Sequence, residues 1–217
     1  MSMRKVQLFN GGVFHIYSRS IAEYKIFNVH SDFVRMKNLL VYHMKKKPVS
    51  YSDFLALNPE VQKKVIEESV ENYVDIIAYC IMPTHIHLIL SQTADNGISK
   101  FMEKVLKSYS MYYNKKTKRE GPLWSGKFRN VLVETDEQLL HLTRYIHLNP
   151  VTIYLVEKPE EWEYSSYREY IGEIEGKKRI CNFEKYLDIK IDSYRIFVEE
   201  RKDYQRELQK IKYLMLE

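Results

Sequence analysis

The chain has 217 residues, with 34 lysines and arginines against 29 aspartates and glutamates, so its formal net charge is +5. Hydrophobic residues make up 45% of it, and only 7 glycines and 6 prolines interrupt them, which excludes a mostly disordered or collagen-like chain. No apolar run approaches the roughly 20 residues of a membrane span, the N-terminus lacks a secretory pattern, and two cysteines form no disulfide framework. We therefore expect a cytoplasmic protein with one main domain, a C-terminal extension and no membrane contact.

Hydrophobic periodicity divides the chain into strands and helices. The predicted elements are, in chain order, a strand over 12–18, a helix from 31 to about 45, a helical insert over 49–71, strands over 73–82 and 85–90, a helix over 98–116, a strand over 130–134, a helix from 135 to 149, and helical segments over 160–172 and 188–217. A tight turn at Pro83–Thr84 makes the two central strands antiparallel. Ser31–Asp32 is an expected helix cap, as is Thr135 with Gln138 three residues later. This order favours an α+β fold in which helices cover one face of an antiparallel sheet.

Positive charge is concentrated between residues 104 and 129, which carry eight bases and one acid, a local charge of +7. Aromatic residues are interleaved with these bases. Lysine and arginine neutralise phosphates, and aromatic rings stack on unpaired bases, so the segment predicts a nucleic-acid surface. A solvated helix face followed by a loop would have the same composition. The candidate DNA contacts in this segment are Lys115, Lys116, Lys118, Arg119, Trp124, Lys127 and Arg129.

Two histidines, His85 and His87, lie two residues apart on a predicted strand. Side chains at this spacing project from the same face of a sheet, so both imidazoles could meet one metal ion. A buried or hydrogen-bonded pair without a metal is the alternative that the spacing leaves open.

The helix predicted after Thr135 carries two stripes of side chains at helical spacing. One stripe is apolar, and the other holds His141, Tyr145 and Asn149. A phenolate is a competent nucleophile toward phosphorus when a metal or a base lowers its pKa from about 10. The carbonyl oxygen of Asn149 could complete a His-His-Asn site. A tyrosine at a helix–sheet contact is nevertheless more often a packing residue.

Four short segments stand out in this order along the chain. They are Tyr79–Leu88 (YCIMPTHIHL), Gly121–Phe128 (GPLWSGKF), Arg144–Val151 (RYIHLNPV) and Tyr164–Tyr167 (YSSY). Together they resemble the motifs of the HUH endonucleases in their single-tyrosine transposase form. The likeness is closest to the REP-associated tyrosine transposases and the related insertion-sequence transposases.

The resemblance implies a ferredoxin-like, RRM-like antiparallel sheet with helices packed on it. It places the catalytic domain at residues 1–172, with the insert at 49–71, and leaves 173–217 as a helical C-terminal extension of unknown role. It further implies single-stranded DNA, folded into a hairpin near the cut, as the substrate. Two assemblies stay open, because some relatives are homodimers that exchange the tyrosine helix and others act as monomers.

The site residues follow from the same resemblance. His85 and His87 are the expected metal ligands, Asn149 is the third ligand, and the ion is Mg or Mn. Tyr145 is the expected nucleophile, which forms a 5′-phosphotyrosine and leaves a free 3′-OH. The last two candidate DNA contacts are Arg19 and Arg144, and a surface salt bridge is the alternative role of Arg19.

Three residues depart from the family pattern, and one of them is Ser20, which replaces the usual glycine. Thr84 stands where Asn or Glu is more usual, and Lys127 replaces a common arginine, which turns a bidentate phosphate contact into a point charge. Two other functions remain in competition. One is a non-catalytic nucleic-acid binding module on the same fold. The other is a metal-dependent hydrolase in which water attacks, which is disfavoured because no Asp or Glu near the histidine pair in sequence is an obvious general base.

Overall fold

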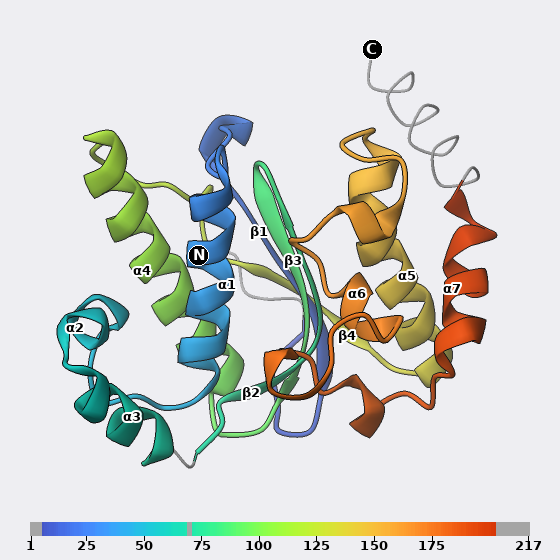
Figure 1. Cartoon of the computed structure of the whole chain (residues 1–217), viewed down its shortest axis with the longest axis horizontal. Coiled ribbons are helices and arrows are strands. Elements are labelled where there is room, and N and C mark those ends of the chain that lie inside the picture. Colours follow the sequence, from blue (N-terminus) through green and yellow to red (C-terminus); the bar gives the residue numbers. More distant parts are fainter. Residues whose placement is uncertain (1–5, 69–70, 203–217) are drawn as a thin grey trace.

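A computed structural model of the chain describes residues 6–68 and 71–202 (Figure 1). The strands are β1 (Val13–Arg19), β2 (Val74–Met82), β3 (His85–Gln92) and β4 (Arg129–Val133). The α-helices are α1 (His30–Met44), α2 (Tyr51–Ala56), α3 (Pro59–Glu67), α4 (Gly97–Thr117), α5 (Asp136–Thr152), α6 (Tyr167–Tyr170) and α7 (Ile191–Glu199). Within the described ranges, no helix combines the length and the apolar character needed to cross a membrane.

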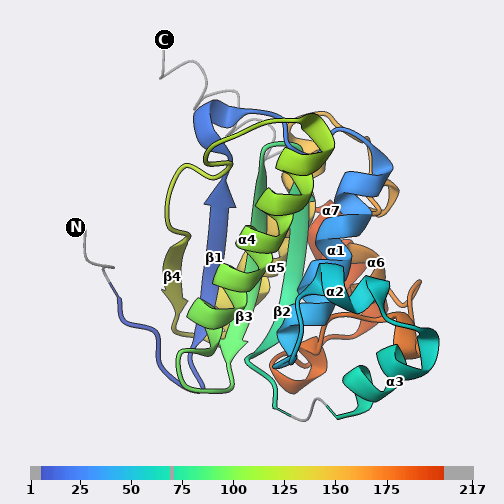
Figure 2. The ribbon, with the colours of Figure 1, turned by 90° about the vertical axis from the view of Figure 1, so that its left-hand side faces the viewer.

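The four strands form one antiparallel sheet in the order β2-β3-β1-β4 (Figure 2). The predicted turn at Pro83–Thr84 joins β2 to β3, so these neighbours form a hairpin. Between β1 and β3 the register places Tyr17 opposite His87 and Arg19 opposite His85. The order β1-α1-β2-β3-α4-β4 with this topology confirms the predicted α+β, ferredoxin-like sheet.

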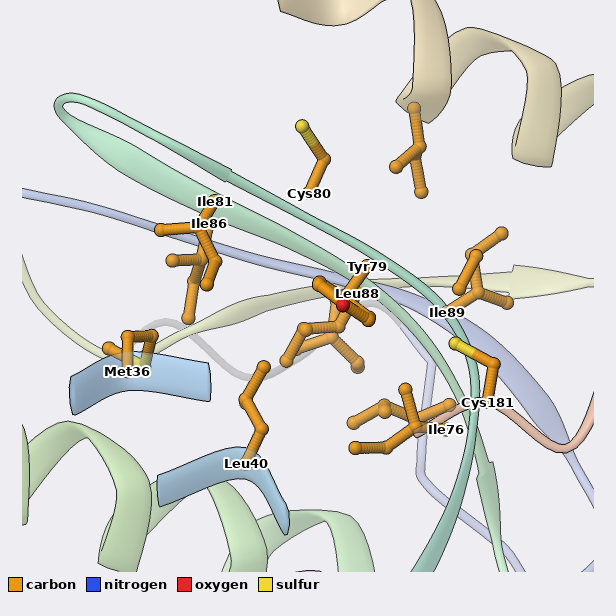
Figure 3. Packing of buried hydrophobic residues seen from close by; sticks show 14 of the residues in the cluster. Met36, Leu40, Ile76, Tyr79, Cys80, Ile81, Ile86, Leu88, Ile89 and Cys181 are labelled. Carbon is orange, nitrogen blue, oxygen red and sulfur yellow. The ribbon is translucent and has the colours of Figure 1, made fainter. Parts of the chain in front are cut away.

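Helices cover both faces of the sheet, so the expectation that they cover one face is wrong. Helices α1 and α4 lie on one side and α5, α6 and α7 on the other (Figure 1). Figure 3 shows Met36 and Leu40 of α1 on one side of the sheet, and Cys80 projecting from the opposite side. The physical reason is visible in β2, whose nine residues are all buried and lack an alternation of polar and apolar side chains. A strand of that kind needs cover on both faces.

The ends of two helices differ from the expected positions. Helix α1 begins at His30, before the predicted cap, and the carboxylate of Asp32 instead accepts the backbone N–H groups of Asn28 and Val29 at 3.2 and 3.3 Å. Helix α5 continues through Pro150 to Thr152. A proline near the end of a helix removes one donor and is tolerated when the rest of the turn is packed. The predicted cap at Thr135 is present, since its hydroxyl accepts the backbone N–H of Gln138 at 3.1 Å.

The insert forms two short helices, α2 and α3. The side chain of Asn58 caps α3 by accepting the backbone N–H of Val61 at 2.9 Å, as the Asn58-Pro59 pair predicts.

The segment after α5 covers the outer edge of β2 and then returns to α5. Backbone bonds of 2.9 Å join Ile81 to Tyr164 and Ile76 to Asn182, which satisfies polar groups that an open sheet edge would expose. Helix α7 packs on α5 through buried Tyr194. The predicted helical tail is described as far as residue 202, and its part over 203–217 lies outside the described residues.

Candidate active site

The histidine pair lies on β3, on the face of the sheet that α5 covers. The ring centroids of His85 and His87 are 4.9 Å apart, so the strand brings the two imidazoles together as their spacing predicts. Ile86 and Leu88 alternate with them, point to the opposite face and are fully buried. Only 6% of His87 is exposed, and His85 is half-buried.

Both histidines use the same ring nitrogen for an internal hydrogen bond. Nδ1 of His85 lies 2.8 Å from the hydroxyl of Thr84, and Nδ1 of His87 lies 3.0 Å from Nε2 of His15. No described residue forms a hydrogen bond with Nε2 of either histidine. A partner on one ring nitrogen fixes the orientation of the other, as is common for histidines that bind metals.

His15 and Thr84 are two site residues that sequence reasoning missed. His15 lies on β1, and its ring stacks on His87 with a centroid distance of 5.2 Å. The two are 72 positions apart in the chain, and only the β1–β3 register brings them together. In the sequence Thr84 is only a departure from the family pattern, and nothing there indicates its hydrogen bond to His85.

Burial keeps these imidazoles neutral. It lowers the pKa of His15 to about 4, and burial together with the charge of Arg19 lowers the pKa of His85 to about 4. The pKa of His87 is lowered well below its usual value by burial and then by the neighbouring rings and Arg19. A neutral imidazole keeps a lone pair, which is the form that binds a metal ion.

Helix α5 presents Tyr145 to this pair. The ring centroids of Tyr145 and His87 are 6.1 Å apart, with the ring planes almost perpendicular. Tyr145 is 44% exposed, so a substrate can reach it. The pKa of its phenol is raised, chiefly by partial burial, and the positive charge of Arg19 opposes this shift in part. The arrangement combines a reachable phenol, two neutral imidazoles and a nearby guanidinium.

Asn149 lies one helical turn after Tyr145 and is 9% exposed. Its buried Nδ2 atom has no hydrogen-bond partner. A 180° rotation of the amide would put its oxygen in that position, so the donor set of two imidazoles and one amide oxygen fits a divalent ion of the Mn or Mg type. The described residues hold no cluster of three or more His, Cys, Asp and Glu that could bind a metal, so a site here depends on this amide and on substrate or water oxygens.

A buried network fixes the orientation of α5. The two ring nitrogens of His147 lie 2.7 Å from the Tyr194 hydroxyl and 2.8 Å from the Ser166 hydroxyl. Tyr194 also donates to the hydroxyl of Thr143 at 2.9 Å. These contacts tie the middle of α5 to α7 and to the segment before α6, which holds Tyr145 toward the sheet.

The nine candidate DNA contacts fall into three groups: three beside the histidine face, two exposed at the end of α4, and four with structural partners. Three of them border the histidine face, because Arg19 ends β1, Lys127 lies in the loop before β4, and Arg129 begins β4. Lys115 and Lys118 are exposed at the end of α4, which covers the opposite face of the sheet.

The other four candidates have structural partners. Trp124 is 9% exposed and donates its indole N–H to the Leu106 carbonyl at 3.1 Å, so in this conformation it does not offer a free face to a base. The guanidinium of Arg144 lies 3.9 Å from the Phe197 ring centroid and donates to the Phe197 carbonyl. It therefore joins α5 to α7.

Lys116 and Arg119 are also occupied. Lys116 pairs with the buried carboxylate of Asp32, and Arg119 donates to the carbonyls of Gly121 and Pro122 after the end of α4. A buried carboxylate needs a partner of this kind, so Lys116 serves the fold. Arg119 serves it by bonding the backbone that follows α4.

Comparisons with known proteins identify the family. Residues 22–149 match the model of the family described as "Transposase IS200 like", which is more than half of the chain. The chain belongs to this family. His85, His87, Tyr145 and Asn149 all lie in the matched region of the transposase, whereas His15 and Arg19 precede it.

Two similar proteins extend the comparison. The chain is 29% identical over 116 residues to a Haemophilus influenzae protein named "Putative REP-associated tyrosine transposase", a match that covers 48% of this chain and 66% of that one, just under two thirds. A solved structure of a REP-associated tyrosine transposase bound to a REP hairpin shares the fold, with a TM-score of 0.59 and 13% identity. That alignment covers 88% of this chain and 96% of the other.

Proposed function

We propose that this transposase is a metal-dependent endonuclease and strand transferase for single-stranded DNA, with Tyr145 as the nucleophile. One observation carries the proposal: the ring centroids of Tyr145 and His87 are 6.1 Å apart. The Nδ1 atoms of neutral His85 and His87 are already hydrogen-bonded. His85, His87 and Asn149 would hold the ion.

The chemistry that Mg or Mn supplies when bound in such a site is polarisation of the scissile phosphate. The phenol oxygen of Tyr145 attacks phosphorus, and the bond from phosphorus to the 3′ oxygen breaks. The phenol loses its proton, and the leaving oxygen gains one to become a 3′-OH. The product is a 5′-phosphotyrosine, which keeps a phosphodiester bond, so the 3′-OH of another strand can reverse the step and join DNA. Arg19 favours this reaction because its charge stabilises the phenolate.

Hairpin DNA is the substrate that we propose. Support comes from the relative that is solved with a REP hairpin and shares this fold, and from the positive charge of residues 104–129. The proposed chemistry needs no exchange of α5 with a second copy, since Tyr145 and His87 meet within a single chain.

A covalent-adduct assay tests the proposal. Labelled hairpin oligonucleotides from DNA flanking the gene are incubated with the protein and Mn or Mg, and the products are run on a denaturing gel. We expect a band of protein-linked DNA that needs the metal and disappears in Tyr145→Phe, with hairpin binding preserved. Metal-dependent cleavage without an adduct, equal in Tyr145→Phe, would instead indicate a hydrolase that uses water. DNA binding without cleavage would indicate a binding module.

A further inference from the structure

A small polar pocket lies beside the histidine face, at the end of β1 and the beginning of β4. Its volume is about 120 Å³. The residues that line it are Tyr17, Ser18, Arg19, Ser125, Lys127 and Arg129.

The lining carries three positive charges and no carboxylate. Arg19 is 3.9 Å from Glu23, but both side chains are largely exposed, so this ion pair holds the guanidinium weakly. Lys127 and Arg129 are exposed, and within the described parts of the chain neither has an ion-pair partner. A pocket lined by three cations suits an anion with multiple oxygens.

The chain builds this pocket from the Gly121–Phe128 segment. Leu123, Trp124 and Phe128 are buried and anchor the segment to the core. The backbone N–H of Ser125 donates to the Arg19 carbonyl at 2.9 Å, which ties the segment to the end of β1. Gly126, between Ser125 and Lys127, has a φ of +144°, a conformation that side-chain-bearing residues rarely adopt. The buried anchors and the glycine therefore hold two lining residues in place.

The strand register sets the distance from the pocket to the reacting groups. Tyr17 pairs with His87 on β3 and with Arg129 on β4, so all three lie in one row across the sheet and on one face. Neighbouring strands are about 4.8 Å apart, so the pocket begins roughly 5 Å from the histidine pair and extends to roughly 10 Å from it.

We propose that this pocket binds a second phosphodiester of the DNA strand, next to the scissile one. The proposal rests on the proposed function, since it takes the histidine pair as the position of the scissile phosphate. A phosphodiester has one negative charge and two free oxygens, which the two guanidinium groups and Lys127 can share. Tyr17 is the one aromatic residue of the lining, and three of the other five residues are cations, so the charged backbone suits the pocket better than a base does. A phosphate bound in this pocket would determine which neighbouring phosphate of the strand lies next to Tyr145.

Methylphosphonate interference tests the pocket. A neutral methylphosphonate replaces one phosphate at a time along a hairpin oligonucleotide with a single-stranded extension. Binding is measured in a Tyr145→Phe background, where no cleavage interferes. We expect one position next to the scissile phosphate at which the substitution weakens binding about tenfold, as the loss of charge-assisted hydrogen bonds does.

The variant Lys127→Ala/Arg129→Ala then identifies the partner of that phosphate. We expect it to bind unmodified DNA about tenfold more weakly and to be insensitive to the methylphosphonate at this one position. Its salt dependence should be shallower by about 0.7, the value of one phosphate contact on a single strand. Lys64→Ala, which removes an exposed lysine from α3, is the matched control and should leave both measurements unchanged.

The outcomes separate this proposal from the proposed function. If the double variant stays as sensitive as its parent at every position, or if no position next to the cut is sensitive, the pocket does not bind a phosphate. If Tyr145 forms no adduct but the double variant still loses its sensitivity to the methylphosphonate at this one position, the phosphate site stands and the proposed chemistry is wrong.

Discussion

Two buried histidines in this protein, His87 and His147, have similar burial but different hydrogen bonding. Burial lowers the pKa of His87 well below its usual value and lowers that of His147 to about 3, so both rings are neutral at pH 7. The two ring nitrogens of His147 are both hydrogen-bonded, at 2.7 and 2.8 Å. His87 has a described partner on Nδ1 alone. The two histidines therefore differ at Nε2, which is hydrogen-bonded in His147 and has no described partner in His87. A ring with both nitrogens bonded cannot bind an ion without losing a contact.

Position along the chain does not reveal this difference. His147 lies between Tyr145 and Asn149, inside the segment that supplies the expected nucleophile and third ligand. A two-residue step along a helix turns a side chain by about 200°, which points His147 away from the sheet site and into the contact with α7. On a strand the same two-residue step keeps His85 and His87 on one face.

The largest expected effect is the loss of activity in His87→Ala. Removing one of two imidazoles should abolish metal-dependent adduct formation and weaken Mn²⁺ binding, because no described cluster of other ligands can take over. The fold should persist, since the His87 ring has one described hydrogen bond to lose, that to His15. Adduct yield on a denaturing gel and Mn²⁺ titration measure the two effects. Adduct formation at the wild-type level would mean that His87 is not a ligand.

His147→Ala should show the opposite pattern. It removes one hydrogen bond from each of the hydroxyls of Tyr194 and Ser166 and opens a cavity beside them, so we expect the free energy of unfolding to fall by about 3 kcal/mol. Urea unfolding followed by circular dichroism measures this change. The folded variant should still bind Mn²⁺ at close to the wild-type affinity. A loss of Mn²⁺ affinity as large as that in His87→Ala would remove the distinction between the two histidines.

A smaller effect is expected for His15→Ala. His15 orients His87 through the 3.0 Å bond between their ring nitrogens, and loss of such a supporting partner typically lowers metal affinity by about 10- to 100-fold. His15→Gln, which offers an amide oxygen as acceptor, should recover part of this loss. His30→Ala, which removes an exposed histidine from the start of α1, is the control for Mn²⁺ titration. Unchanged affinity in His15→Ala would show that His87 needs no support.

The smallest effect concerns pH and the stability that neutral His147 contributes. The pKa of His147 is lowered by burial from 6.5 to about 3, so the unfolded chain binds a proton that the folded chain excludes. The stability that its neutral form contributes is complete above pH 6.5 and is lost as the pH falls toward 3. His147→Gln should be less stable than wild type at pH 7, and the difference should narrow by pH 4. Urea unfolding at both pH values tests this, and a difference that widens on acidification would contradict it.

Much of the fold and part of the site follow from local periodicity. A period of two places His85 and His87 on one face, and a period of 3.6 places Tyr145 and Asn149 one turn apart, so neither pairing needs knowledge of the tertiary structure. The His15–His87 contact depends on which strands become neighbours and in what register. That is a long-range property which no local pattern encodes.

Two of the expected DNA contacts, Trp124 and Arg144, also pack against other parts of the chain. Trp124 and Arg144 carry side chains that suit nucleic acids, yet both also suit packing, and their environment decides between the two roles. Trp124 is buried with its indole N–H bonded to Leu106, and Arg144 lies on the ring of Phe197. The second helical layer was missed for a similar reason, since the continuous apolar run of β2 was not taken as a sign of cover on both faces.

The most direct test of the central claim is to identify the residue that carries the DNA. Tyr17 also lies beside His87, with ring centroids 6.1 Å apart, so a second phenol is near the same histidine. The adduct formed with a short hairpin oligonucleotide is digested with protease and nuclease, and mass spectrometry locates the tyrosine that retains a nucleotide. We predict that the modified peptide contains Tyr145. A nucleotide on Tyr17, or on any other residue, would contradict the assignment of Tyr145 as the nucleophile.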